Sequence, residues 1–116
     1  MKAQQNQGSV TPPAGFSNYL GVTSQSAYSV GVNDIFRIYQ TLEGFNTADL
    51  AWGTANAKTV TLSFWVQSSL TGTFGMWLTN NDGSRLYPTS YVINSANTWE
   101  YKTITLTGDL TGSWTT

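Results

Sequence analysis

The feature that most limits how this chain can fold is a two-residue alternation of apolar and polar side chains that recurs between turn signals. It is clearest in KTVTLSFWVQSS (58–69), and it returns in TFGMWLTNN (73–81) and TWEYKTITLTG (98–108). Successive side chains of a strand point to opposite faces, so the alternation predicts strands with one apolar face. No stretch keeps a helical apolar period over several turns. We therefore expect an all-β fold, in the form of an antiparallel two-sheet β-sandwich.

Further segments complete the predicted set of strands. A short strand is expected near NYLGVTS (18–24), another in IFRIYQTLE (35–43), and an extended return in SRLYPTSYVIN (84–94). LTG (70–72) and NNDG (80–83) are expected turns. The apolar faces of the strands predict a core made of Val60, Leu62, Phe64, Phe74, Met76, Ile104 and Leu106.

The same parity places several aromatic and polar side chains on the face opposite the core. In 35–43, Phe36, Ile38 and Leu42 share the apolar face together with Gln40, which must either bind backbone groups or mark where that face opens to solvent. The outward side chains that could contact a ligand or a partner are Arg37, Tyr39, Trp65, Gln67 and Trp77. Aromatic rings stack on the apolar faces of sugars, and Arg or Gln can orient hydroxyls. The alternative is that loops, missing strands or a neighbouring subunit cover these rings.

The connection GFNTADLAWGTANA (44–57) carries apolar residues of its own, Phe45, Leu50 and Trp52. Long loops of this kind pack over an open end of a domain or contact a ligand, and we favour packing as a plug.

Composition limits the partners of the chain. Its 116 residues suit a single domain, and five basic against six acidic residues give no basic surface for nucleic acid. Aromatic residues reach 14%, which favours contacts with sugars or proteins. Cysteine is absent, MKAQQNQGSV lacks the apolar run of a signal peptide, and no apolar stretch is long enough to insert into a membrane.

The residues argue against catalysis. The chain has no histidine, no G-x-S-x-G elbow and no phosphate-binding loop, so we expect a protein that is not an enzyme. A glycosidase pair would have to come from the six carboxylates, most of which lie in turn-like or loop-like stretches: Asp34, Glu43, Asp49, Asp82, Glu100 and Asp109. Asp82 is interpreted as a turn residue and not as part of a calcium loop. No cofactor or metal is predicted, and a structural calcium elsewhere in the chain is left open.

The order FRIYQTLEG, AKTVTLSFWVQSS and NTWEYKTITLTGD is similar to the carbohydrate-binding-like jelly-roll domain of bacteriophage tail-fibre and other virion structural proteins. TPPAGFSNYLGVTS, EGFNTADLAWGTANAKTVTLSFWV and SSLTGTFG strengthen this resemblance, which covers nearly the whole chain. More distantly, the chain resembles the carbohydrate-binding modules of cellulases. The resemblance implies a jelly-roll sandwich in a virion, assembled in the host cytoplasm and acting extracellularly. Its partners would be other virion subunits or copies of itself, and host-surface polysaccharide.

The resemblance also predicts strands that the sequence lacks. In the family a strand precedes the position of MKAQQNQ, and an apolar strand follows GSW. Either residues 1–116 are a segment of a larger protein, or other chains or segments supply those strands, and unpaired edges are expected in both cases. Two function classes remain open: a virion structural or adhesion domain, and a carbohydrate-binding module of a polysaccharide-active enzyme.

Overall fold

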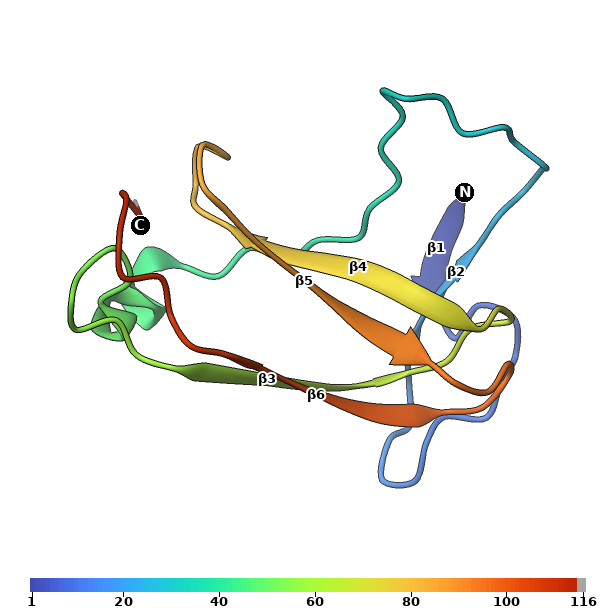
Figure 1. Cartoon of the computed structure of the whole chain (residues 1–116). Coiled ribbons are helices and arrows are strands. Elements are labelled where there is room, and N and C mark those ends of the chain that lie inside the picture. The colour runs from blue at the N-terminus through green and yellow to red at the C-terminus, as the bar shows by residue number, and fades with distance from the viewer. Residues whose placement is uncertain (115–116) are drawn as a thin grey trace. The chain divides into compact units, whose positions relative to one another are not determined.

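A computed structural model describes residues 1–114, which form two compact units, Met1–Tyr39 and a second unit that begins at Gln40. Their regular structure consists of strands and two short 3-10 helices, and the strands pair into three antiparallel two-stranded sheets (Figure 1). The expectation of an all-β chain agrees with this content. In the described residues no helix is long and apolar enough to cross a bilayer.

The first unit is built on one small sheet. Strand β1 (Lys2–Gln5) pairs with β2 (Leu20–Thr23), with Lys2 opposite Thr23 and Gln5 opposite Leu20. The Tyr19 hydroxyl closes the intervening loop, because it donates to the Gln7 carbonyl at 2.9 Å and accepts from the Val10 N–H at 2.8 Å. Strand β2 lies within the predicted segment 18–24. Strand β1 was not predicted, because its residues KAQQ show no alternation of apolar and polar side chains. All four are exposed in the structure.

The predicted strand at 35–43 is wrong for this structure, since the segment lies outside the strands of the described residues. Phe36, Ile38 and Leu42 do not share a buried face, because between 58% and 64% of their surface is exposed. Gln40 is also exposed, so it opens to solvent and is not a buried amide. Alternation fixes which side chains would share a face, but a strand forms only where a neighbour supplies the ladder of hydrogen bonds.

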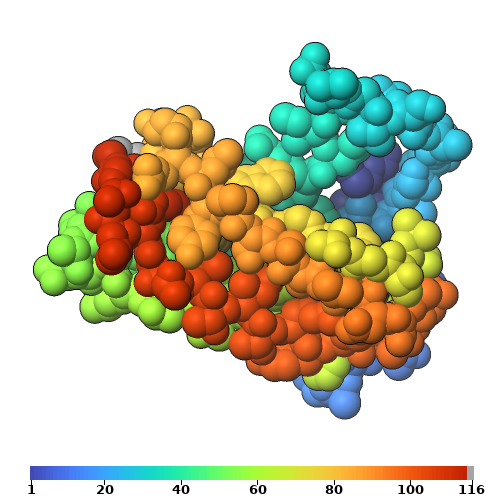
Figure 2. All heavy atoms as spheres, viewed as in Figure 1, coloured from blue at the N-terminus to red at the C-terminus, as the bar shows by residue number. Residues whose placement is uncertain are grey.

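The second unit contains two antiparallel two-stranded sheets. Strand β3 (Val60–Val66) pairs with β6 (Glu100–Leu106), and β4 (Gly72–Thr79) pairs with β5 (Leu86–Ile93) as a hairpin. Strands β3, β5 and β6 lie within the segments predicted at 58–69, 84–94 and 98–108, whereas β4 begins one residue before its predicted segment 73–81, at Gly72 of the expected turn. The 3-10 helices η1 (Gly44–Asn46) and η2 (Ala48–Leu50) lie in the long connection before β3. Figure 2 shows β5 and β6 side by side on one face of this unit.

The inner faces of the two sheets meet through aromatic rings. Tyr91 of β5 contacts Phe64 of β3 edge-on and stacks on Phe74 of β4, with ring centroids 5.1 and 5.8 Å apart. Ile93 and Leu106 are the buried apolar residues of the described chain, at 1% and 2% exposure.

The predicted core therefore needs a correction. Leu106 is buried, but six members of the set are only half-buried: Val60, Leu62, Phe64, Phe74, Met76 and Ile104. Each sheet has two strands, so the inner side chains lack lateral neighbours that would exclude water. Ile93 was missing from the predicted core although it becomes the most buried residue.

Candidate functional site

The five side chains predicted to face outward do not come together as one site. Arg37 and Tyr39 belong to the first unit, whereas Trp65, Gln67 and Trp77 belong to the second. Within the first unit the Arg37 guanidinium lies over the Tyr39 ring, 5.4 Å from its centroid. Alternate residues of an extended segment lie on the same side. Arg37 and Tyr39 therefore share one side, as predicted, although their segment belongs to no sheet.

Trp65 and Trp77 lie on different surfaces of the second unit. Phe64 and Phe74 point into the space between the two sheets, where both meet Tyr91. Trp65 follows Phe64 in β3, and Trp77 has the parity opposite to Phe74 in β4, so each tryptophan points out of its own sheet. Because the sheets meet through their inner faces, these outer faces are turned away from each other. One ligand of ordinary size therefore cannot contact both tryptophans.

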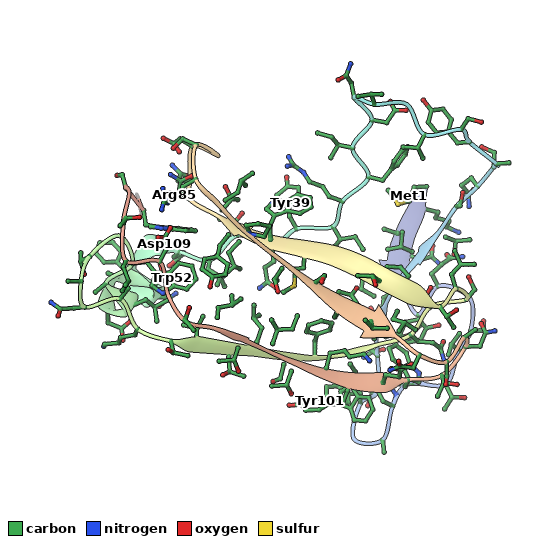
Figure 3. The ribbon with its side chains drawn as sticks, in the orientation of Figure 1. Met1, Tyr39, Trp52, Arg85, Tyr101 and Asp109 are labelled. Atoms are coloured by element: carbon green, nitrogen blue, oxygen red, sulfur yellow. The ribbon has the colours of Figure 1, made fainter. Side chains whose placement is uncertain are left out.

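Trp65 has an aromatic partner that the predicted set did not include. Register places Tyr101 of β6 directly opposite Trp65 of β3, with ring centroids 5.4 Å apart and a tilt of 53°. Trp65 is 40% exposed and Tyr101 is 55% exposed, so the rings form a pair that is open to solvent. Figure 3 shows Tyr101 pointing away from the β4–β5 sheet.

Hydroxyl groups extend the same face along both strands. Ser63 lies opposite Thr103, and Thr61 lies opposite Thr105, whose hydroxyl oxygen is 3.4 Å from that of Thr61. All four residues are exposed. The outer face of the β3–β6 sheet thus combines two adjacent rings with a row of hydroxyl donors and acceptors. We call it the Trp65–Tyr101 face.

The surface around Trp77 has a different chemistry. Trp77 lies opposite Pro88, and its diagonal neighbours on β5 are Leu86 and Ser90, with Val92 further along the same face. Trp77, Leu86 and Val92 are 41%, 58% and 48% exposed. This outer face of the β4–β5 sheet mixes apolar side chains with the hydroxyls of Thr73, Thr79 and Ser90, and it lacks the second aromatic ring of the Trp65–Tyr101 face.

Gln67 lies one residue beyond the end of β3 and is half-buried. The alternation that predicted an outward Gln67 side chain holds only within the strand, so it no longer decides where this amide points. The structure does not add Gln67 to the Trp65–Tyr101 face.

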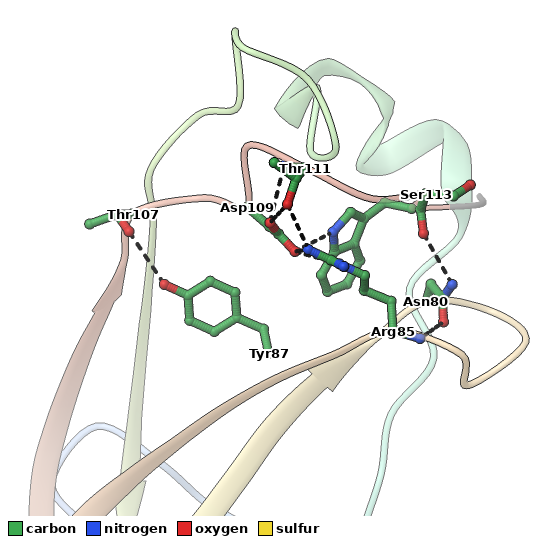
Figure 4. Close-up of polar contacts among 8 residues, drawn as sticks. Asn80, Arg85, Tyr87, Thr107, Asp109, Thr111 and Ser113 are labelled. Carbon is green, nitrogen blue, oxygen red and sulfur yellow. Dashed lines mark hydrogen bonds and ion pairs between the residues drawn. The ribbon is translucent and has the colours of Figure 1, made fainter.

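A polar cluster holds one end of the second unit together (Figure 4). The Asp109 carboxylate forms an ion pair with Arg85 at 2.6 Å and accepts a hydrogen bond from the Trp114 indole N–H at 3.1 Å. Asn80, only 5% exposed, donates to the Ser113 carbonyl and accepts from the Arg85 N–H. These contacts fix the residues that follow β6 to the turn between β4 and β5.

The long connection 44–57 joins the same end of the unit. The Trp52 ring packs against Tyr87 at 5.4 Å and edge-on against Trp114 at 4.8 Å, and its N–H donates to the Lys58 carbonyl. Trp52, Arg85 and Asp109 gather at this end (Figure 3). The Trp52 contacts agree with the expected plug, whereas Phe45 of the same loop is 97% exposed and takes no part in it.

Hydrogen bonds lower the pKa values of the Asp109 and Glu100 carboxyls. Burial raises the pKa of Asp109, but hydrogen bonds from the Thr111 N–H, Arg85 and Trp114 outweigh burial and lower it. The hydrogen bond from Lys102 and that from the Ser95 N–H lower the pKa of Glu100 to about 2. Glu100 also accepts from the Asn94 N–H, so it ties β6 to the connection that follows β5. Both carboxylates have local structural partners.

The remaining carboxylates do not form a metal site. Among residues 1–114 no group of three or more acidic, histidine or cysteine side chains is placed to hold a metal ion. Asp82 accepts from the N–H and the hydroxyl of Ser84 in the turn after β4, and these bonds lower its pKa. This geometry agrees with the interpretation of Asp82 as a turn residue.

Comparison with protein-family models, with curated protein sequences and with solved structures gives no match to this chain. The Trp65–Tyr101 face is the candidate site. Tyr101 could have been found from the sequence, because EYKTITL places it opposite in parity to Ile104 and Leu106. The register that places Tyr101 opposite Trp65 could not have been found from the sequence.

Proposed function

We propose that this chain is a non-enzymatic structural or adhesion domain of a bacteriophage virion, from a tail fibre or a capsid-associated protein. In this proposal it is a jelly-roll β-sandwich that binds host-surface glycans through the Trp65–Tyr101 face. The resemblance of FRIYQTLEG, AKTVTLSFWVQSS and NTWEYKTITLTGD to the virion family supports the class of protein. The two antiparallel sheets that meet through Phe64, Phe74 and Tyr91 support the sandwich.

The observation that carries the glycan proposal is the exposed pair of rings near one end of a hydroxyl-bearing face. A pyranose ring has an apolar face that stacks on Trp or Tyr, while its hydroxyls need donors and acceptors at the rim. Trp65 and Tyr101 supply the stacking surface, and Ser63, Thr61 and Thr103 supply hydroxyls beside it. A chain with a net charge of −1 has little attraction for a charged polymer, which favours neutral sugars.

A carbohydrate-binding module of a polysaccharide-active enzyme is the second candidate function. The same face would bind the polysaccharide, so the geometry of the rings does not separate the two candidates. The sequences that flank this chain do separate them. Collagen-like, coiled-coil or repetitive β-fibre sequence favours the virion protein, and a catalytic domain favours the enzyme module.

Glycan-array binding of the chain displayed multivalently tests the proposal. Trp65→Ala and Tyr101→Ala should each remove binding, because losing one stacking ring costs about 0.5 to 1.5 kcal/mol beyond the lost area and weak multivalent contacts amplify the loss. Trp77→Ala is the matched control, since it removes an equally exposed tryptophan from the other sheet and should leave binding intact.

Circular dichroism of each variant must show an unchanged fold for this comparison to hold. Binding that survives both Trp65→Ala and Tyr101→Ala would contradict the glycan site. Unfolding of Trp65→Ala, or the dissociation of an oligomer by it, would assign the tryptophan a structural role.

A further inference from the structure

Residues 35–43 expose apolar side chains that no strand of residues 1–114 covers, although the Phe36 ring contacts Tyr28 edge-on. Ile35, Phe36, Ile38 and Leu42 are each at least 58% exposed, and the segment lies outside the strands of the described residues. The Arg37–Tyr39 contact shows that alternate residues already share one side. The segment thus has one side with Phe36, Ile38 and Leu42, interrupted by Gln40, and an opposite side with Arg37, Tyr39 and Thr41, a pattern that suits the edge of a sheet.

The second unit offers open edges to such a segment. Each of its two sheets contains two strands, so every strand has one edge whose N–H and C=O groups lack a strand partner in residues 1–114. These edges are not equivalent. Pro88 lies within β5 and has no N–H, and Gly75 lies within β4 and weakens it as a template.

Side-chain chemistry separates the two remaining edges. The inner face of β6 carries the ion pair between Glu100 and Lys102, which an apolar neighbour would desolvate. The inner face of β3 is apolar throughout, and all four of its residues are only half-buried: Val60, Leu62, Phe64 and Val66. A new strand beside β3 would cover this row with its own apolar side chains. The nine residues 35–43 are long enough to span the seven of β3.

We propose that residues 35–43 of one copy of this chain add to the open edge of β3 in a second copy, and that the exchange is reciprocal. Each copy carries one donor segment and one acceptor edge, so two copies satisfy both and the assembly closes as a symmetric dimer. Phe36, Ile38 and Leu42 then extend the apolar inner face of the partner's sheet. Within residues 1–114 neither the segment nor the edge has a strand partner, and a second copy of the chain can supply both.

Strand exchange would also complete the surface predicted from the sequence. With Phe36, Ile38 and Leu42 turned inward, Arg37 and Tyr39 point outward beside Trp65 of the partner copy. The arginine and the tyrosine would then extend the Trp65–Tyr101 face. This extension rests on the proposed glycan function, whereas the dimer itself does not.

Sedimentation equilibrium over a wide concentration range tests the dimer. Ile38→Pro removes an N–H from the centre of the donor segment, and it should raise the dimer dissociation constant at least about tenfold. Ala27→Pro is the matched control, because Ala27 is also exposed and irregular but lies outside 35–43, and it should leave the dimer unchanged. A monomer at every concentration, an oligomer larger than a dimer, or a dimer that Ile38→Pro leaves intact would overturn the proposal.

A synthetic peptide IFRIYQTLE provides a test that changes no residue of the protein. The peptide should compete for the β3 edge and convert dimers into peptide-bound monomers, whereas a scrambled peptide of the same composition should not. Failure of the peptide to dissociate the dimer would overturn the assignment of donor and acceptor. Both measurements are made without glycan, so loss of glycan binding by a protein that still dimerises would contradict the proposed function alone.

Discussion

Phe64 and Trp65 are neighbours in the chain that contact opposite surroundings. The Phe64 ring lies 5.1 Å from Tyr91 of the other sheet, whereas the Trp65 ring lies 5.4 Å from Tyr101 on the outer face and stays 40% exposed. Two consecutive residues of β3 thus have different roles: the Phe64 ring holds two sheets together, and the Trp65 ring faces solvent.

This contrast predicts different costs for two adjacent substitutions. Phe64→Ala removes the ring contact between the sheets and should lower the free energy of unfolding by about 2 to 3 kcal/mol, below the usual ~3 to 5 for a fully buried Phe because Phe64 is half-buried. Trp65→Ala loses only a cross-strand pair and should cost less than about 1 kcal/mol. Urea denaturation of both variants measures these values, and a larger loss for Trp65→Ala would contradict the assignment of faces.

Gly112 should tolerate substitution less well than Gly83, because a side chain at Gly112 would meet Arg85. Gly112 has φ +80°, and a Cβ there would lie 2.4 Å from the Arg85 guanidinium carbon. Gly83 has a similar φ of +73° but open space around its Cβ position. Gly83→Ala should cost about 1 kcal/mol from backbone strain alone, and Gly112→Ala should cost clearly more, because Arg85 must also leave Asp109. Thermal unfolding compares the two, and equal losses would show that Arg85 adapts without cost.

The plug formed by the 44–57 connection should depend on Trp52 and not on Phe45. Trp52→Ala removes contacts with Tyr87 and Trp114 and should destabilise the chain by about 2 to 4 kcal/mol. Phe45→Ala in the same loop should change stability by less than about 0.5 kcal/mol, because its ring is 97% exposed. Denaturant titration of the two variants checks this. A similar loss for both would mean that the loop packs through Phe45 as well.

Glu100 should contribute stability that disappears in acid. Its pKa is lowered from 4.5 to about 2 in the folded chain, so the contribution is fully present above pH 4.5 and is lost as pH falls toward about 2. Glu100→Gln should therefore be less stable than the wild type at pH 7, and it should lose less stability over that acid range. Melting temperatures between neutral and acid pH measure the difference.

Asp49→Asn is the control for that experiment. Asp49 pairs with Lys58 at 3.6 Å, but 75% of its side chain is exposed, and exposed pairs contribute little to stability. Its acid profile should follow that of the wild type. An unchanged acid limb in Glu100→Gln would show that other groups govern acid unfolding.

The alternation of side chains was enough to predict β3, β4 and β6 of the second unit, while β5 was expected only as an extended return. Period-two patterning in VTLSFWV and EYKTITL reports local geometry, and a strand pair with one apolar face satisfies that pattern directly. The loop contact of Trp52 followed from the same reasoning, since an apolar ring in a long connection needs a surface to cover.

The same pattern failed where the outcome depended on a partner. Residues 35–43 also alternate, with Gln40 as an exception on the apolar side, yet they stay outside the strands of this structure because no neighbouring strand in the described residues supplies their hydrogen bonds. Strand β1 shows the converse, because KAQQ has no pattern but pairs with β2 through its backbone.

The sequence by itself determined which side chains share a strand face, because pleating is a property of each strand alone. Only the tertiary structure decided that Trp65 meets Tyr101 and that Trp77 lies on the opposite surface of the same unit. Register and sheet pairing join residues that are far apart in the chain, and they are set by the mutual burial of Phe64, Phe74 and Tyr91, which no single segment encodes.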